Sequence, residues 1–109
     1  HGQSIRGLNM TITEKTAETA IELVVAGRLD TTTAPQLEAK VNETDKGIKL
    51  LILNLKDVEY ISSAGLRVVL MAHKRMAGFG AKLVVKSPSP FCLQVFSATG
   101  MDAVLTIQS

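Results

Sequence analysis

Alternation of apolar and polar residues predicts two strands near the beginning of the chain. In residues 10–14, apolar Met and Ile positions alternate with threonines, which is typical of an edge strand with one face toward a core. Residues 19–26 have the composition of a second strand that ends at Gly27, and residues 15–18 form a connection suited to a hairpin. We therefore expect the chain to begin with two adjacent strands.

A third, more apolar segment predicts the centre of a sheet. Residues 48–55 are apolar on both faces apart from Lys49 and Asn54, a pattern typical of a strand that is parallel or covered on both sides. One further strand is expected over residues 81–86, and a last one over residues 103–107.

Helical spacing of apolar positions appears between these strands. A first helix is predicted from about residue 33 to residue 46. Thr33, with Gln36 three residues later, fits a capping box at its beginning. Gly47 is suited to a left-handed cap at its end.

Two more helices follow from the same pattern. One is predicted over residues 63–77, ended by Gly78 and Gly80, and another begins at Ser89-Pro90, with Ser as the N-cap and Pro at the first helical position. The residues expected to face inward are Leu66, Val69, Leu70, His73, Met76 and Ala77 in the second helix and Phe91, Val95 and Phe96 in the third.

The order of these elements, ββαβαβαβ, indicates the α/β fold class, with a single open mixed β-sheet and helices packed against it. The chain has 109 residues, 46% of them hydrophobic and 20% charged, as expected for one globular domain with a core. It begins with His1-Gly2 instead of Met. Residues 1–8 are therefore expected to be a tail or a cloning remnant, and residues 9–109 to be the domain.

Charge and composition exclude several kinds of partner. The net charge is +2 and the aromatic content is 4%, so the basic groups and stacking rings of a nucleic-acid-binding protein are not expected. The longest apolar run, around residues 50–55, is too short to span a membrane. A single cysteine, Cys92, fits a reducing compartment, and the cytoplasm is the expected location.

Candidate catalytic and metal-binding residues are few. His73 lies mid-helix, no Cys/His spacing suggests zinc, and residues 78–82 are too short for a phosphate-binding P-loop. A response-regulator receiver could use Asp57 as its acceptor, but the acidic pair that would hold Mg²⁺ is missing. Cys92 is most simply a small buried side chain. We therefore expect no enzymatic activity, no cofactor and no metal site.

The junction between the apolar strand and the second helix holds the most informative residues. Ser62 and Ser63 lie there, followed by Gly65. Free backbone N–H groups and the helix dipole favour added negative charge at a helix N-terminus, which suits a serine that receives a phosphate. A serine at this position is also among the preferred N-cap residues, and capping is the commoner role of a serine at a strand-to-helix turn. The local pattern alone leaves both interpretations open.

A family resemblance adds to this pattern. Residues 60–70, Tyr-Ile-Ser-Ser-Ala-Gly-Leu-Arg-Val-Val-Leu, resemble the signature of STAS domains, the family of bacterial anti-sigma factor antagonists. Residues 27–30, Gly-Arg-Leu-Asp, and the following residues 33–37 are similar to that family's G-x-L-D segment and the start of its first helix. The resemblance covers about residues 9–107.

The resemblance implies a switch and not a catalyst. An unphosphorylated domain of this family binds an anti-sigma factor that is also a serine kinase, and so frees a sigma factor. The kinase uses ATP to phosphorylate the domain, and alignment on Gly65-Leu66 places the acceptor at Ser63. Ser62 stands where the family usually has Asp, so Ser62 is the second candidate acceptor.

The resemblance also implies which residues meet the partner. The loop of residues 27–32 is expected to lie beside the acceptor, where Asp30 either pairs with a basic residue of the partner or simply holds the turn before the helix. The residues implied in partner binding are Arg28, Leu29, Asp30, Thr31, Ser62, Ser63, Ala64, Gly65, Leu66 and Arg67.

Two functions remain open at this point. The first is an anti-sigma factor antagonist with an anti-sigma factor/serine kinase and a phosphatase as partners, acting as a monomer or weak dimer without nucleic acid or membrane insertion. The second is a STAS scaffold or accessory subunit of a transport or signalling complex without a sigma pathway. A serine at the acceptor position favours the first, because transporter-linked modules often lack it.

Overall fold

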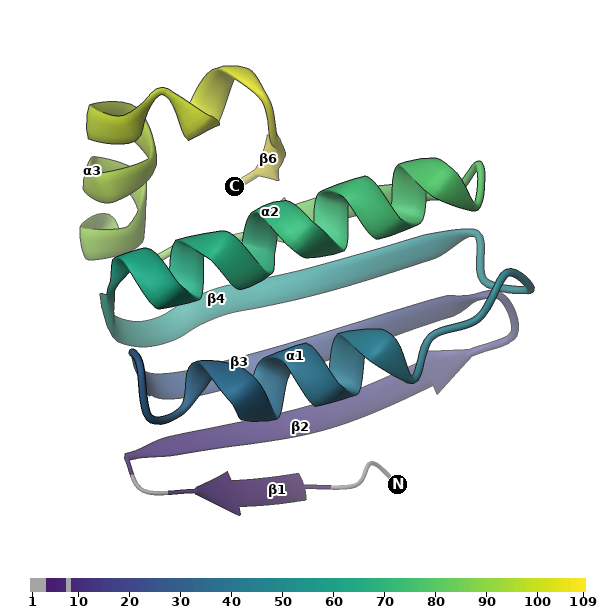
Figure 1. Cartoon of the computed structure of the whole chain (residues 1–109), viewed down its shortest axis with the longest axis horizontal. Helices are drawn as coiled ribbons and strands as arrows, with labels where there is room; N and C mark the ends of the chain where they lie inside the picture. The colour runs from purple at the N-terminus through teal and green to yellow at the C-terminus, as the bar shows by residue number, and fades with distance from the viewer. Residues whose placement is uncertain (1–3, 8) are drawn as a thin grey trace.

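The computed structural model describes residues 4–7 and 9–109, and these residues form one mixed sheet. The strands follow one another in the sheet in chain order (Figure 1). The first two pairings are antiparallel, and the pairings from β3 to β6 are parallel. The strands are β1 (Ser4–Gly7), β2 (Met10–Ala17), β3 (Ala20–Leu29), β4 (Leu50–Ile61), β5 (Lys82–Lys86) and β6 (Thr106–Gln108).

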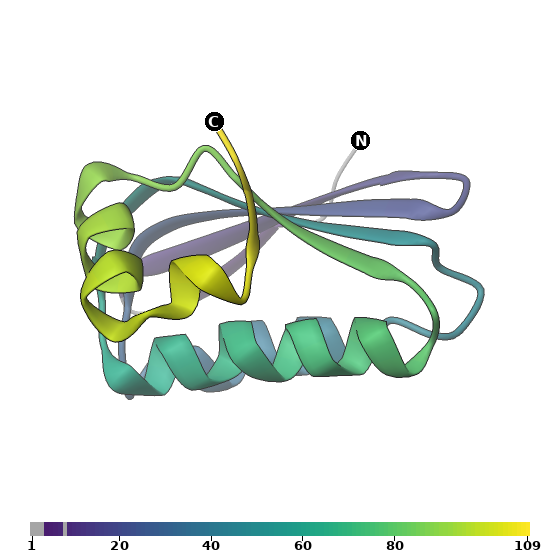
Figure 2. The same ribbon diagram turned by 90° about the horizontal axis from the view of Figure 1, so that it is seen from above.

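The helices are distributed unevenly around this sheet. Helices α1 (Ala34–Asn42) and α2 (Ser63–Gly78) lie side by side on one face (Figures 1 and 2). Helix α3 (Pro90–Thr99) lies at the end of the sheet where α2 begins, and a short 3-10 helix, Met101–Ala103, leads from it toward β6 (Figure 1). Within the described residues, no helix lies on the other face of the sheet (Figure 2).

The core lies between the sheet and this single layer of helices. In β4, Leu51, Leu53 and Leu55 are fully buried, whereas the alternate residues Ile52 and Asn54 are half-buried. Side chains alternate between the two faces of a strand, so the helix-covered face takes the leucines. The uncovered face of the sheet tolerates a polar network, in which the Asn54 amide donates to the Glu22 carboxylate at 3.0 Å.

The predicted element order is confirmed from Met10 onward, with β1 as an additional first strand. Ser4–Gly7 pair with β2, so β2 is not the edge of the sheet as expected, whereas the assignment of residues 1–8 to a tail or remnant stays a prediction. Residues 1–3 and 8 lie outside the described residues. A four-residue polar strand at an edge has too little apolar patterning to be recognised in the sequence.

The ends of several elements differ from the prediction. Helix α1 ends at Asn42 and not at residue 46, and Gly47 has no left-handed conformation. The capping box at Thr33 does not form, because its hydroxyl donates to the backbone carbonyl of Arg28 at 2.7 Å. Strand β4 continues past residue 55 to Ile61. The last strand, expected over residues 103–107, is Thr106–Gln108.

The buried face of α2 is rotated from the predicted one. Its buried residues are Gly65, Val68, Val69, Ala72 and Met76. Leu70 and His73 are half-buried, and Ala77 is exposed. The extent of the helix itself was predicted to within one residue.

The beginning of α3 agrees with the prediction. The Ser89 hydroxyl accepts a hydrogen bond from the backbone N–H of Cys92 at 3.2 Å, with Pro90 in the first turn. Cys92 is fully buried, and burial raises the pKa of its thiol, so it behaves as the small apolar side chain that was expected. Phe91, expected to face inward, is instead 38% exposed.

Candidate functional site

The ends of β3 and β4 bring the two sequence motifs together. Leu29 pairs with Ile61 in the parallel ladder, and the backbone N–H of Ser62 donates to the Leu29 carbonyl at 2.9 Å. The residues that follow each strand therefore leave the same edge of the sheet next to each other. Figure 1 shows α1 and α2 beginning at this common end.

Ser63 is the first residue of α2 and is exposed. Ser62 is the N-cap residue, but its side chain makes no capping hydrogen bond, and its buried hydroxyl oxygen has no hydrogen-bond partner among the described residues. The backbone N–H groups of a first helical turn have no intrahelical acceptor. Neither serine therefore caps α2, and an anion attached to Ser63 can approach these N–H groups.

Asp30 organises the loop beside Ser63. One carboxylate oxygen, Oδ1, accepts hydrogen bonds from the backbone N–H of Thr32 at 3.0 Å, from the Thr32 hydroxyl at 2.7 Å and from the backbone N–H of Thr33 at 3.2 Å. The hydrogen bond from the Thr32 hydroxyl is the main cause that holds the pKa of Asp30 below its usual value, and the backbone bonds add to it. The side chain is therefore ionised at neutral pH and holds the turn before α1.

Gly65 allows α2 to begin this close to the sheet. A Cβ atom at this position would lie 2.8 Å from Leu29 Cγ, 2.9 Å from Ile61 Cγ1 and 2.9 Å from the Leu29 carbonyl oxygen. Any larger residue would have to move the first turn of α2 away from the strand ends. The glycine therefore fixes the position of Ser63 relative to the Asp30 loop.

A row of side chains in contact extends the site toward α3. The Arg28 guanidinium lies 4.3 Å from the centroid of the Tyr60 ring, and that ring lies 5.4 Å from the ring of Phe91. Arg28 also approaches Asp30, with 3.7 Å between Nε and Oδ2. We call Arg28, Tyr60 and Phe91 the aromatic row. Tyr60 and Phe91 are not among the predicted site residues, because no local sequence pattern signals a contact between β4 and α3.

Comparison with known proteins identifies this arrangement. The model of the STAS domain family matches residues 10–109. The chain belongs to the STAS domain family.

Relatives of this STAS domain come from several bacteria. BtrV of Bordetella bronchiseptica is 35% identical over 82 residues, which cover 74% of this chain and 71% of that protein. The anti-sigma-B factor antagonist of Bacillus subtilis is 31% identical over 103 residues, which cover 94% of each chain.

The fold of this STAS domain is shared with solved structures. The phosphorylated form of the Bacillus cell fate determinant SpoIIAA matches with a TM-score of 0.72 and 18% identity, covering 90% of this chain and 91% of that one. The unphosphorylated form of SpoIIAA matches with a TM-score of 0.75 and 17% identity, over 90% and 88% of the two chains.

The STAS domain presents only some of the predicted partner-binding residues at its surface. Arg28, Thr31, Ser63 and Arg67 are exposed, and Asp30, Ser62, Ala64 and Leu66 are half-buried. Leu29 is fully buried and Gly65 is buried. In this structure Leu29 packs beneath the first turn of α2, and its assignment to partner binding stays a prediction.

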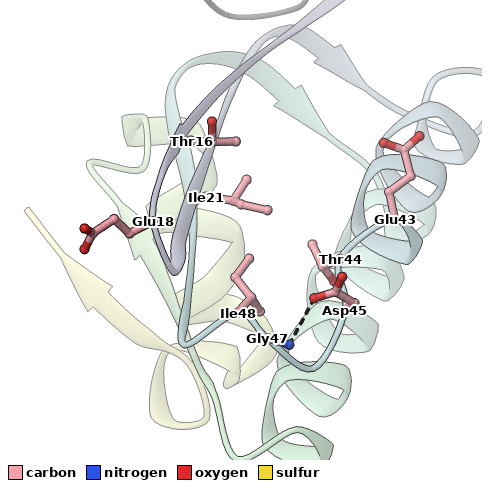
Figure 3. Close-up of a pocket in the computed structure, with 8 residues that line it drawn as sticks. All are labelled: Thr16, Glu18, Ile21, Glu43, Thr44, Asp45, Gly47 and Ile48. Atoms are coloured by element: carbon pink, nitrogen blue, oxygen red, sulfur yellow. Dashed lines mark hydrogen bonds between the residues drawn. The ribbon is translucent and has the colours of Figure 1, made fainter.

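At its other end, this STAS domain has an acidic pocket of about 290 Å³ between the β2–β3 hairpin and the connection from α1 to β4 (Figure 3). Glu18, Glu43 and Asp45 line it, and Asp45 Oδ1 accepts a hydrogen bond from the backbone N–H of Gly47 at 3.0 Å.

No group of three or more His, Cys, Asp or Glu side chains among the described residues is placed to hold a metal ion. Within that same part of the chain, no helix is long and apolar enough to cross a membrane.

Proposed function

We propose that this STAS domain is an anti-sigma factor antagonist controlled by phosphorylation of Ser63. In the unphosphorylated state it binds an anti-sigma factor that is also a serine kinase, and so frees a sigma factor in the cytoplasm. The observation that carries the proposal is the exposed Ser63 hydroxyl on the first turn of α2, beside the ionised Asp30 loop. The relative from Bacillus subtilis, named an anti-sigma-B factor antagonist, supports the identity of the partner.

The position of Ser63 suits a switch that leaves the fold intact. A phosphate adds about −1.5 to −2 charges at neutral pH. The helix dipole and the uncapped N–H groups of the first turn stabilise negative charge at this position. SpoIIAA, which shares the fold, exists in a phosphorylated and an unphosphorylated form.

Release of the partner follows from the same charge. A partner surface that fits the neutral hydroxyl would have to bury a dianion without a counter-charge, which costs several kcal/mol. The Asp30 carboxylate lies in the neighbouring loop and adds a like charge. The phosphorylated domain therefore leaves a partner that the neutral domain binds.

The kinase reaction tests the acceptor directly. The protein is incubated with the anti-sigma factor/serine kinase from its own genome and ATP, and the phosphate is mapped by mass spectrometry. We expect phosphate on Ser63, loss of labelling in Ser63→Ala, and retained labelling in the matched control Ser62→Ala. Phosphate found only on Ser62 or on residues 31–33 would contradict the assignment, and binding without phosphorylation would indicate a scaffold.

A further inference from the structure

Three large apolar side chains among the described residues are exposed, and one of them is linked to the proposed partner site through Tyr60. Phe91 is 38% exposed, Leu93 45% and Val104 51%. Phe91 packs on Tyr60, and Tyr60 on Arg28, so Phe91 is joined by direct contacts to the loop that Asp30 organises. Leu93 lies two residues further along α3, and residues two apart on a helix do not share a face.

Arg28 has hydrogen-bonding capacity that the domain does not use. Its side chain is 45% exposed and approaches Asp30 through Nε at 3.7 Å, which is beyond hydrogen-bond distance. Among the described residues its guanidinium makes that ion pair and the contact with the Tyr60 ring, and no hydrogen bond. A guanidinium has five donors and binds a carboxylate with two parallel hydrogen bonds.

A specific interface needs more surface than residues 28–31 and 62–67 offer. A stable protein–protein interface covers about 800 Å² on each partner, or about 20–30 residues. The predicted partner-binding set has ten residues, two of them buried. Figure 1 places α3 beside the beginning of α2, and α3 contacts β4. The partner surface can therefore continue across Tyr60 onto the beginning of α3.

We propose that the aromatic row, Arg28, Tyr60 and Phe91, is the centre of the surface that binds the anti-sigma partner. The partner places an apolar side chain against the exposed part of Phe91 and a carboxylate against the Arg28 guanidinium. Aromatic and arginine side chains at the centre of an interface contribute a large share of its binding energy. This inference rests on the proposed function and adds α3 to the binding surface.

A pair of alanine substitutions on α3 tests the inference. Affinity for the cognate anti-sigma factor is measured with ADP bound, so that no phosphate is transferred, for the wild type, Phe91→Ala and the matched control Leu93→Ala. We expect Phe91→Ala to weaken binding at least fivefold and Leu93→Ala to change it less than twofold. Thermal unfolding of each variant shows whether the folded fraction is unchanged.

A second measurement uses the wild type and does not depend on the folding of a variant. Hydrogen exchange is compared with and without the anti-sigma factor, and slower exchange is expected in peptides that cover residues 56–61 and 89–93, in addition to residues 28–33 and 61–67. No slowing over residues 89–93, or equal losses of affinity in Phe91→Ala and Leu93→Ala, would overturn the inference. A wild type that binds no anti-sigma factor would overturn the proposed function and this inference with it, whereas wild-type affinity in Phe91→Ala overturns the inference alone.

Discussion

The first turn of α2 packs against the ends of two strands with no room for another carbon atom. A Cβ at Gly65 would lie 2.8 Å from the Leu29 side chain and 2.9 Å from the Leu29 carbonyl oxygen. The backbone at Gly65 is helical, so the requirement for glycine comes from space and not from an unusual dihedral angle. The sequence motif around Ser63 therefore has a packing reason as well as a chemical one.

Replacing this glycine should lower stability and displace Ser63. We expect Gly65→Ala to reduce the free energy of unfolding by about 1–3 kcal/mol, because the leucine and the strand end must shift. Chemical denaturation measures this change. The matched control is Gly78→Ala on the same helix, where an added Cβ meets nothing within 4 Å. Because alanine reduces the conformational entropy of the unfolded chain, Gly78→Ala should stabilise the fold by about 0.5–1 kcal/mol. Equal effects of the two substitutions would contradict the packing argument.

The carboxylate of Asp30 should make stability depend on pH. The folded state holds the pKa of Asp30 below its unfolded value of about 3.9, so its contribution is present above that value and is lost as the pH falls through the folded pKa. Between about pH 6 and about pH 3, the urea midpoint of the wild type should therefore fall further than that of Asp30→Asn. Identical slopes would show that the Thr32 and Thr33 hydrogen bonds do not depend on the charge.

At the scale of elements, Lys40 ties α1 to the sheet. Its side chain is 3% exposed, and its Nζ lies 2.6 Å from a Glu14 oxygen on β2 and 3.3 Å from a Glu43 oxygen. The hydrogen bond to Glu14 raises the pKa of Lys40 against the opposing effect of burial, and Glu43 raises it further. A helical pattern in the sequence gives no sign that one lysine is buried, because its partner Glu14 is on a distant strand.

Removing this lysine should change how the protein responds to alkaline pH. A raised folded pKa stabilises the fold below the unfolded pKa of about 10.4, and that contribution is lost as the pH rises through the folded pKa. We expect the wild type to lose more stability than Lys40→Met between about pH 8 and about pH 11, as measured by urea unfolding. Parallel losses in the two proteins would show that the Glu14 contact does not depend on the lysine charge.

Element boundaries show where sequence patterns succeed and fail. The start of α2 at Ser63 and of α3 at Pro90 could be predicted, because local serine, glycine and proline signals specify a helix N-terminus. The end of α1 could not, since the Thr44 hydroxyl donates to the Val41 carbonyl at 2.6 Å and closes the helix before Gly47. Strand β4 was predicted to end near residue 55, because the charged residues that follow interrupt its apolar run.

The candidate site, too, could be predicted only where local sequence motifs encode it. The chemistry of Ser63 and Asp30 is encoded in short motifs, and their proximity follows from the pairing of Leu29 with Ile61. The contact between Tyr60 and Phe91 depends on how α3 packs across β4, which no local pattern contains. Tertiary contacts of this kind have to be read from the structure.

For the whole molecule, phosphorylation should act at the surface and leave the fold unchanged. Because the helix dipole stabilises charge at Ser63, we expect phosphorylated protein to keep the backbone amide spectrum of the unmodified chain except near residues 28–33 and 61–67. Affinity for the anti-sigma partner should fall at least tenfold, or ~1.4 kcal/mol. Spectral changes throughout the sheet would instead indicate a refolding switch.

The hairpin between β2 and β3 lies at the far end of the molecule from Ser63. Ala17 pairs with Ala20 beside the exposed Glu18, whereas Leu29, which is next to Ser62, is at the other end of β3. Ten residues of strand separate the two ends by roughly 30 Å. A fluorescent reporter inserted at Glu18 would therefore stay clear of a bound partner. The labelled domain could then be followed inside a living cell, and its binding to the partner could be detected, without the reporter blocking the surface around Ser63.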